Sequence, residues 1–349
     1  MDVFPWFKCK LPFGLYHATC ALPSYYLPPY NLPMRRAMLL YNPAAGRFPV
    51  RPFIHSADKV LSKAGWSLEI IETRSSNHIV QMAKQAASEK YDAVFAVGGD
   101  GTLGKVASGL VDSETALGVL PAGTSNVWAR ELNLVPFSWI RWWTLQENAD
   151  LLAKAVNCPI DIGICNDHPF LMWAGMGLDA MTVQKIEPRM RLEKFFTFPE
   201  YAASTIWNAS IWHGLNLRLW VDDNEVKGHY LLAVVNNIRH YMGGLANLSP
   251  EAYLDDGIFD IWLFSGASLV DAFRHAFDLW AGRHVDSKEA RRIPFRNLHL
   301  EADALFSVQM DGEPAFNTRQ AVISVRQRVI RVLLPPHSFG LLKNPPRFD

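Results

Sequence analysis

The sequence predicts an α/β protein with two domains: an N-terminal domain built on a parallel sheet and a mainly antiparallel β-sandwich domain after it. The chain has 349 residues, more than one typical domain holds. Strand-like and helix-like patterns alternate as far as residue 132, whereas strand-like segments follow one another after residue 157. We therefore expect an irregular leader at 1–34, an α/β domain at 35–157 to which about 326–344 returns, and a β-rich domain at 158–325.

The leader fits neither a membrane-spanning helix nor a signal peptide. The stretch from Leu11 to Met34 contains no Asp, Glu, Lys or Arg, but five prolines interrupt it. Proline at that density excludes an ordinary spanning helix, and no small-residue cleavage site follows.

Four strands are predicted in the first domain: short apolar runs predict those at 37–41, 92–97 and 116–120, and an alternating pattern predicts the one at 66–72. Continuous apolar runs are typical of strands that are covered on both faces. Apolar residues at helical spacing follow each run, at 60–64, 79–86, 103–110 and 127–132. This alternation predicts parallel βαβ units with right-handed crossovers.

The second domain is predicted from closely spaced β-type segments joined by short turns. They lie at 160–164, 171–174, 215–221, 229–235, 258–264, 298–302, 306–310 and 322–325. A last apolar run, Val329 to Leu334, is expected to return to the first domain.

Composition excludes several classes of protein. The chain contains 34 Lys and Arg against 34 Asp and Glu, so it lacks the basic surplus expected of a nucleic-acid-binding protein. The four cysteines show neither zinc-ligand spacing nor the density of a disulfide scaffold: Cys9, Cys20, Cys158 and Cys165. We expect a reducing, cytoplasmic setting and no nucleic-acid partner.

Three turns follow predicted strands and are suited to anions, at 42–46, 97–102 and 121–126. Glycine lets backbone N–H groups approach a phosphate closely, and a helix N-terminus adds positive potential. Because these turns follow strand carboxyl ends, we expect them on one edge of the sheet.

Other interpretations of the middle turn are weaker. Gly99, Gly101 and Gly104 match a dinucleotide fingerprint, but they follow the third strand, and no acidic residue stands about 20 positions on at a strand end. Gly104-Lys105 resembles a P-loop, but Val106 stands where Ser or Thr would hold Mg²⁺. A simple hairpin at Asp100-Gly101 disagrees with the helical period after Thr102.

The segment 98–102, Gly-Gly-Asp-Gly-Thr, resembles the signature of diacylglycerol, sphingosine, ceramide and NAD kinases. Further motifs resemble the lipid-kinase branch, the diacylglycerol kinase catalytic-domain family, in the same order along the chain: 42–46, 121–126, Ala129 to Leu132, 249–257 and 311–313. The resemblance runs from about Met38 to Pro335 and implies an NAD kinase/diacylglycerol kinase-like fold.

The resemblance implies ATP-dependent phosphorylation of a lipid hydroxyl, with Mg²⁺. Asp100 would act at the ATP-bound Mg²⁺ through a water molecule, because Mg²⁺ keeps several waters. The implied nucleotide-binding residues are Asn42, Pro43, Gly46, Thr73, Gly98, Gly99, Gly101, Thr102, Gly123, Thr124 and Asn126.

The resemblance also implies roles for acidic residues in the second domain. Asp311 matches the family's general base, and we expect Glu313, two residues on, to raise the pKa of that base. From the residues alone, a β-turn at Asp311-Gly312 with a solvated glutamate is an alternative. Asp256 would bind a structural Mg²⁺ together with the carbonyls of Tyr253 and Ile258, or belong to an ordinary acidic turn.

Position 105 departs from the family pattern, because members often have Leu-Asn-Glu-Val where this chain has Leu103-Gly104-Lys105-Val106. Lys105 would either contact the phosphates or point to solvent, which leaves a non-catalytic binding protein as an alternative. The aromatic residues between Phe137 and Trp143 would lie at a membrane interface or in a buried helix. A cationic cluster, Arg189, Arg191 and Lys194, would meet anionic headgroups or be solvated.

We therefore expect a two-domain lipid kinase that converts diacylglycerol to phosphatidic acid. The ATP site would lie between the domains, and the protein would be cytoplasmic and contact a membrane surface peripherally to reach its lipid substrate. A homodimer is possible. The alternatives are a sphingosine/ceramide-type kinase, an NAD kinase and a non-catalytic nucleotide- or lipid-binding homologue.

Overall fold

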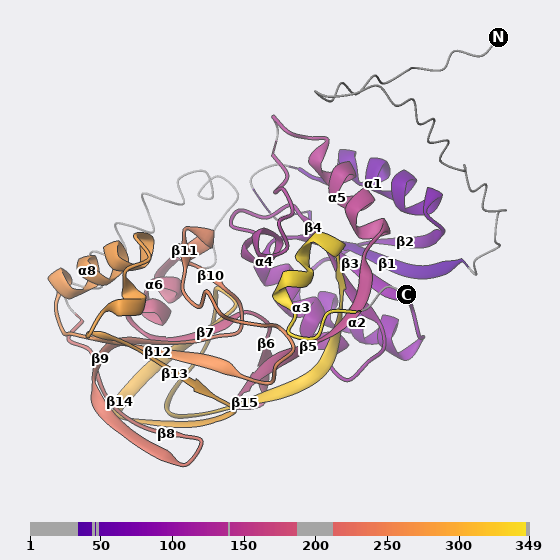
Figure 1. Cartoon of the computed structure of the whole chain (residues 1–349). Helices are drawn as coiled ribbons and strands as arrows, with labels where there is room; N and C mark the ends of the chain where they lie inside the picture. The colour runs from indigo at the N-terminus through magenta and orange to yellow at the C-terminus, as the bar shows by residue number, and fades with distance from the viewer. Residues whose placement is uncertain (1–33, 44–45, 47–48, 139, 187–211, 347–349) are drawn as a thin grey trace, which may run out of the picture. The chain divides into compact units, whose positions relative to one another are not determined.

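The computed structural model describes residues 34–43, 46, 49–138, 140–186 and 212–346 (Figure 1). The leader at 1–33 and the cluster of Arg189, Arg191 and Lys194 lie outside the described residues. From Met34 onward the chain forms one compact unit.

The first half of this unit is a parallel sheet between two layers of helices. Its strands lie in the order β4-β3-β1-β2, and every neighbouring pair is parallel. The elements are β1 (Arg35–Tyr41), α1 (Arg51–Lys63), β2 (Trp66–Glu72), α2 (Ser76–Ser88), β3 (Ala93–Gly98), α3 (Asp100–Leu110), β4 (Ala116–Pro121), α4 (Val127–Glu131) and α5 (Thr144–Ala153).

Alternate side chains of β1 explain why helices cover both faces of this sheet. Leu39 packs into one apolar core with α1 and α5, whereas Met38 and Leu40 pack into another with α2 and α3. Both cores exclude water, so β3 and β4 are buried along their whole length. The carboxyl ends of these strands stay free to carry the glycine turns.

The second half is built from antiparallel strands, with two α-helices among its described residues. Its elements are β5 (Val156–Cys165), β6 (His168–Phe170), β7 (Trp173–Gly177), α6 (Leu178–Ile186), β8 (Leu215–Val221), β9 (Asn224–Asn236), β10 (His240–Tyr241), β11 (Ala246–Asn247), β12 (Phe259–Ser265), α8 (Leu269–Trp280), β13 (Ala290–Phe295), β14 (Asn297–Met310) and β15 (Glu313–Leu334). Short 3₁₀ turns lie at Met242–Gly244, His284–Asp286 and Pro336–Leu341. Among the described helices, none is long and apolar enough to cross a membrane.

Strand β15 joins the two halves. It pairs antiparallel with β14 and β5, and then Arg331 and Val332 pair parallel with β4 (Figure 1). The sheet is therefore continuous from one half into the other. This arrangement keeps the start of β15 at a fixed place relative to α3.

Some predicted elements differ from the structure. The two strands expected at 298–302 and 306–310 form the single strand β14, whose pairing with β15 shifts in register between Glu301 and Phe306. The segment from Phe137 to Trp143 is not a buried helix, because its described residues are irregular at 137–138 and form turns at 140–143, before α5. Phe137 is buried there, the rings of Trp142 and Phe53 pack at a tilt, and Ile140 is exposed.

Candidate active site

The glycine turns meet at one edge of the parallel sheet. A Cβ on Gly123 would collide with the Cα of Gly99 and lie 2.8 Å from its nitrogen. A Cβ on Gly46, whose φ is +68°, would collide with the carbonyl oxygen of Ala122. The backbones of the three turns therefore pack directly against one another, and only glycine permits this packing.

Two predicted nucleotide-binding side chains brace this edge from inside. Asn126, with φ of +51°, accepts from the N–H of Gly123 at 2.8 Å and donates to its carbonyl at 2.9 Å. The buried Thr73 hydroxyl donates to the carbonyl of Tyr41 at 3.1 Å, which ties β2 to β1. Both side chains are thus engaged within the protein.

The other predicted nucleotide-binding residues lie in the same region. Thr102 is buried, and its side chain lies against Gly98, where a Cβ would be 2.6 Å from its hydroxyl oxygen. Asn42 follows β1, and its N–H donates to the carbonyl of Val97 at 3.5 Å. Pro43 is exposed beside it, and Thr124 is half-buried in the turn that follows β4.

Asp100 connects two of the turns. Its carboxylate accepts from the N–H groups of Val127 at 3.0 Å and Trp128 at 3.2 Å, at the start of α4. Burial raises the pKa of this carboxyl, and the backbone hydrogen bonds act in the opposite direction. Each oxygen of Asp100 already accepts one N–H group and can accept another hydrogen bond through its second lone pair.

Asp311 lies in the tight turn between β14 and β15. Asp311 and Gly312 both have positive φ, 52° and 82°, as a two-residue hairpin turn of type I′ requires. The carboxylate is buried and accepts from three consecutive N–H groups, those of Leu171, Met172 and Trp173, at 2.9, 2.8 and 3.2 Å. The turn of the alternative interpretation is thus present, but its aspartate is buried, and Glu313, 42% exposed, is paired with Lys105.

The pKa of Asp311 is raised to about 6. Burial is the largest cause, the three N–H groups oppose it, and the charge of Asp100 raises the value further. Asp100, rather than the expected Glu313, is thus the carboxylate among the main causes of this shift. Near pH 7 Asp311 is ionised and able to accept a proton.

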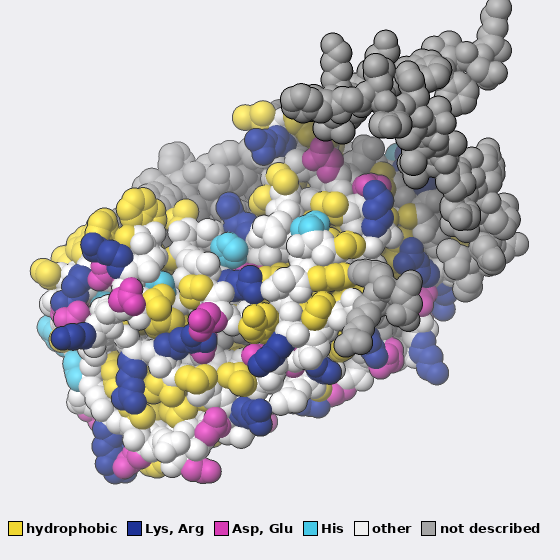
Figure 2. All heavy atoms as spheres, viewed as in Figure 1, with side chains coloured by type: hydrophobic (Ala, Val, Ile, Leu, Met, Phe, Trp, Pro, Cys, Tyr) yellow, Lys and Arg dark blue, Asp and Glu magenta, His cyan; other side chains and the backbone are white. Residues whose placement is uncertain are grey.

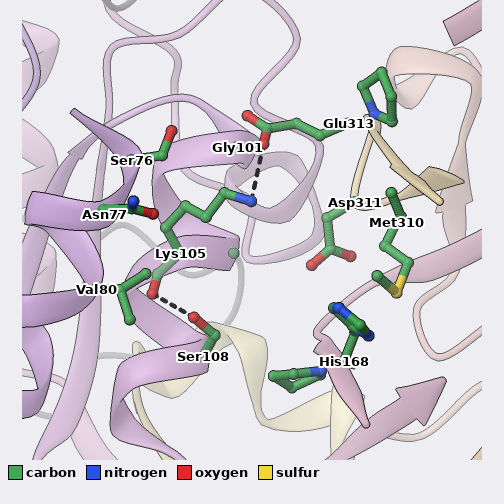
Figure 3. A pocket seen from close by; sticks show the side chains of 14 residues that line it. Ser76, Asn77, Val80, Gly101, Lys105, Ser108, His168, Met310, Asp311 and Glu313 are labelled. Carbon is green, nitrogen blue, oxygen red and sulfur yellow. Dashed lines mark hydrogen bonds and ion pairs between the residues drawn. The ribbon is translucent and has the colours of Figure 1, made fainter. Parts of the chain in front are cut away.

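A cavity of about 310 Å³ opens beside Asp311 (Figure 3). Its walls come from the start of α2, one side of α3, the start of β6 and the turn at 310–315. Sequence reasoning missed several lining residues, namely Ser76, Asn77, Ser108 and His168. Only the predicted start of a helix near Ser76 offered a signal, since nothing in the sequence links α2 to β6.

Lys105 projects across this cavity to Glu313, with 3.2 Å between Nζ and Oε2 (Figure 3). The Glu313 carboxylate lies so close to α3 that a Cβ on Gly101 would collide with its Oε1. An acidic group therefore lies against the first turn of α3, where helix geometry favours negative charge. Lys105 does not point freely to solvent, because its ammonium pairs with this carboxylate. Its contact with the phosphates stays a prediction.

The predicted structural magnesium site has a cation of its own. Asp256 accepts from the N–H of Ile258 at 3.0 Å, and the Lys343 ammonium lies 3.9 Å from its other oxygen. Within the described part of the chain, no group of three or more His, Cys, Asp or Glu side chains is placed to hold a metal. A site made of the Asp256 carboxylate and the carbonyls of Tyr253 and Ile258 therefore stays a prediction, and no step of the reaction proposed below depends on it.

Two family models match this chain, one over its parallel first half and one over its antiparallel second half. The family model described as the diacylglycerol kinase catalytic domain matches residues 36–165. A second model, the YegS C-terminal NAD kinase beta sandwich-like domain, matches residues 173–334. Together they place the glycine turns in the first domain and Asp311 in the second.

Individual relatives agree with these models over most of their length. The diacylglycerol kinase of Bacillus subtilis (strain 168) is 26% identical over 282 residues, which are 80% of this chain and 90% of that protein. The diacylglycerol kinase of Staphylococcus epidermidis is 25% identical over 315 residues, covering 89% and 96%. A crystal structure of a putative diacylglycerol kinase from Bacillus anthracis has the same fold, with a TM-score of 0.70 at 23% identity, covering 87% of this chain and 98% of that one.

Proposed function

The chain belongs to the diacylglycerol kinase catalytic domain family, and we propose that it transfers the γ-phosphate of ATP to the free hydroxyl of diacylglycerol. The class of enzyme, a phosphotransferase with an alcohol group as acceptor, follows from the family. The observation that carries the proposal is Asp311. This ionisable carboxylate, with a pKa of about 6, lines a cavity that also borders the first turn of α3.

In the proposed reaction the glycine turns hold the phosphates. The N–H groups at the start of α3 have no partner one turn earlier in the helix and favour anions. Gly46, Gly99 and Gly123 allow the three turns to pack together at one point, which supports a single phosphate site there. Phosphoryl transfer needs mainly such positioning and charge neutralisation.

Asp311 serves as the base in this proposal. The lipid hydroxyl oxygen bonds to the γ-phosphorus, the bond to the bridging oxygen breaks, ADP leaves, and the hydroxyl proton passes to Asp311. Positioned bases of this kind contribute typically 10²–10⁴-fold. The N–H groups of Leu171, Met172 and Trp173 hold the carboxylate in place.

The Mg²⁺ that accompanies ATP would offset the charge of the transferring phosphate. Asp100 fits an indirect role toward it, because both of its oxygens already accept N–H groups and a water can still bridge. The acceptor lipid resides in a bilayer, so we also propose that the protein contacts a membrane surface peripherally.

The test is transfer of label from γ-labelled ATP, with Mg²⁺, to a panel of acceptors. Vesicles of diacylglycerol, sphingosine or ceramide and a solution of NAD separate the family's activities. We expect labelled diacylglycerol with the native chain and a loss of about 10²–10⁴-fold with Asp311→Asn. Asp223→Asn, at an exposed turn, is the matched control. Equal labelling by Asp311→Asn would show that Asp311 is not the base. Labelling of another acceptor instead of diacylglycerol would show that this acceptor is the substrate.

A further inference from the structure

Helix α8 carries large apolar side chains on its outer face. Val270 is 75% exposed, Phe273 52%, Phe277 52% and Trp280 68%. Their spacing of three, four and three residues places them in one stripe along the helix. We call these four residues the α8 face. In Figure 2, hydrophobic side chains gather over α8 at the upper left of the view.

The inner side of α8 fixes the orientation of this face. His275 and Leu279 are buried, and His275 Nε2 lies 2.7 Å from the carbonyl of Ser265. A capping box between Ser268 and Asp271 begins the helix. The helix is thus anchored with its apolar stripe outward, the reverse of an ordinary surface helix.

The inner side of α8 also connects with the candidate active site. Leu269 and Ala272 pack against a small apolar cluster made of Leu231 and Leu178, the residue that begins α6. The next residue, Asp179, accepts from Gln309 Nε2 at 2.6 Å. Gln309 in turn accepts from the N–H of Gly312, in the same turn as Asp311. Helix α8 is therefore connected through α6 to the turn that holds the proposed base.

The area of the α8 face is too small for a stable dimer contact. Fully buried aromatic side chains contribute about 150–250 Å² each, so the exposed parts of these four amount to roughly 400–500 Å². A stable protein interface needs about 800 Å² per partner. The composition instead suits the bilayer interface, where Phe and Trp insert shallowly and cations remain outside. Arg283 provides such a cation, since its guanidinium lies 4.8 Å from the ring centre of Phe277.

We propose that the α8 face inserts into the interfacial region of a lipid bilayer and holds the enzyme on the membrane that contains its acceptor. The proposal rests on the proposed function in one respect: a diacylglycerol acceptor resides in the bilayer. The bilayer is the single occupant proposed. Apolar insertion, rather than attraction to anionic lipid, provides the binding.

The experiment measures sedimentation of the full chain with phosphatidylcholine vesicles that contain diacylglycerol. The variant Phe273→Gln/Phe277→Gln/Trp280→Gln removes the face with residues that favour helices. Leu305→Gln and Val322→Gln are matched controls, because these side chains are 64% and 55% exposed elsewhere. We expect at least tenfold weaker vesicle binding by the triple variant, unchanged binding by both controls, and little effect of salt.

Kinase assays separate this proposal from the proposed function. With a short-chain diacylglycerol below its micelle concentration, the triple variant should match the native chain, whereas its activity on vesicles should fall at least tenfold. Undiminished vesicle binding by the triple variant overturns the proposal. So does binding that salt abolishes, or a change from dimer to monomer as its only effect. If the native chain phosphorylates neither acceptor, the proposed function fails, and the vesicle result still decides the role of α8.

Discussion

Lys105 of α3 and Glu313 of β15 form an ion pair of 3.2 Å across the cavity that also contains Asp311. Both side chains are more than one third exposed, 38% and 42%, so solvent screens the pair and its contribution to stability is small. The pair instead holds the Lys105 and Glu313 side chains in position beside the cavity. Among the described residues, Lys105 is the cation paired with the Glu313 carboxylate beside Gly101.

Reversing the charge at position 105 should impair phosphate binding more than stability. Lys105→Glu places a second carboxylate beside Glu313 at the start of α3, so we expect kcat/KM for ATP to fall at least tenfold. The free energy of unfolding should change by less than about 1 kcal/mol. The exchange Lys105→Glu/Glu313→Lys should recover much of the activity. Steady-state kinetics and urea unfolding measure both quantities.

The control for this prediction is Lys154→Glu, which breaks the exposed pair with Asp150 at one end of α5. It should leave the ATP kinetics unchanged. Full activity of Lys105→Glu would show that Glu313 does not interfere with nucleotide binding.

A methyl group at position 123 should separate the glycine turns. The Cβ of Gly123→Ala would overlap the backbone of Gly99 and lie 2.8 Å from the Asn126 side-chain oxygen. Backbone cannot move aside as a flexible side chain does, so we expect a loss of about 1–3 kcal/mol and weaker ATP binding. Gly340→Ala, with no atom within 4 Å of its Cβ, is the control. Equal stability of the two variants in urea would contradict close contact between the turns.

The part of the site formed by the glycine turns was predictable from local patterns. Apolar runs alternate with helical periods, and turns at the ends of neighbouring parallel strands must lie on one edge. The packing of Gly99 on Gly123 adds detail to that expectation. Sequence similarity, rather than periodicity, pointed to Asp311.

The remaining features depend on contacts between distant residues. Lys105 and Glu313 come together only because β15 continues from the second half of the sheet into the first. Helix α8 was missed although it has an apolar period; a period does not say which face is buried. The hairpin at Asp311 has the sequence of an ordinary turn, and its burial comes from the chain at 171–173.

Asp256 and Lys343 give a test of the predicted structural magnesium. The Lys343 ammonium lies 3.9 Å from the Asp256 carboxylate, where it opposes a second cation. Lys343→Ala removes that competition, so Mg²⁺ without nucleotide should raise the Tm of this variant more than that of the native chain. Thermal unfolding with EDTA or Mg²⁺ measures the difference. Lys343→Ala/Asp256→Asn is the control, and an equal response to Mg²⁺ in all three proteins would exclude Asp256 as a ligand.

The raised pKa of Asp311 predicts opposite effects of pH on activity and stability. Proton acceptance needs the ionised form, so kcat/KM should fall about tenfold per pH unit below about 6. The free energy of unfolding changes in the opposite direction with pH. The folded-state pKa of about 6 exceeds the ordinary value of 3.8, so protonation stabilises the fold. That contribution is complete below about pH 4 and is lost as the pH rises through about 6.

A shift of this size corresponds to roughly 2–3 kcal/mol between those limits. Asp311→Asn carries no titrating group there, so the native chain should lose this amount relative to the variant between about pH 4 and pH 7. Urea unfolding at a series of pH values measures it. Because the pKa of Asp161 is also raised to about 6, the comparison with Asp311→Asn is needed to cancel that background. Parallel stability curves for the two proteins would mean that Asp311 titrates normally, and then the fall in activity below pH 6 would need another base.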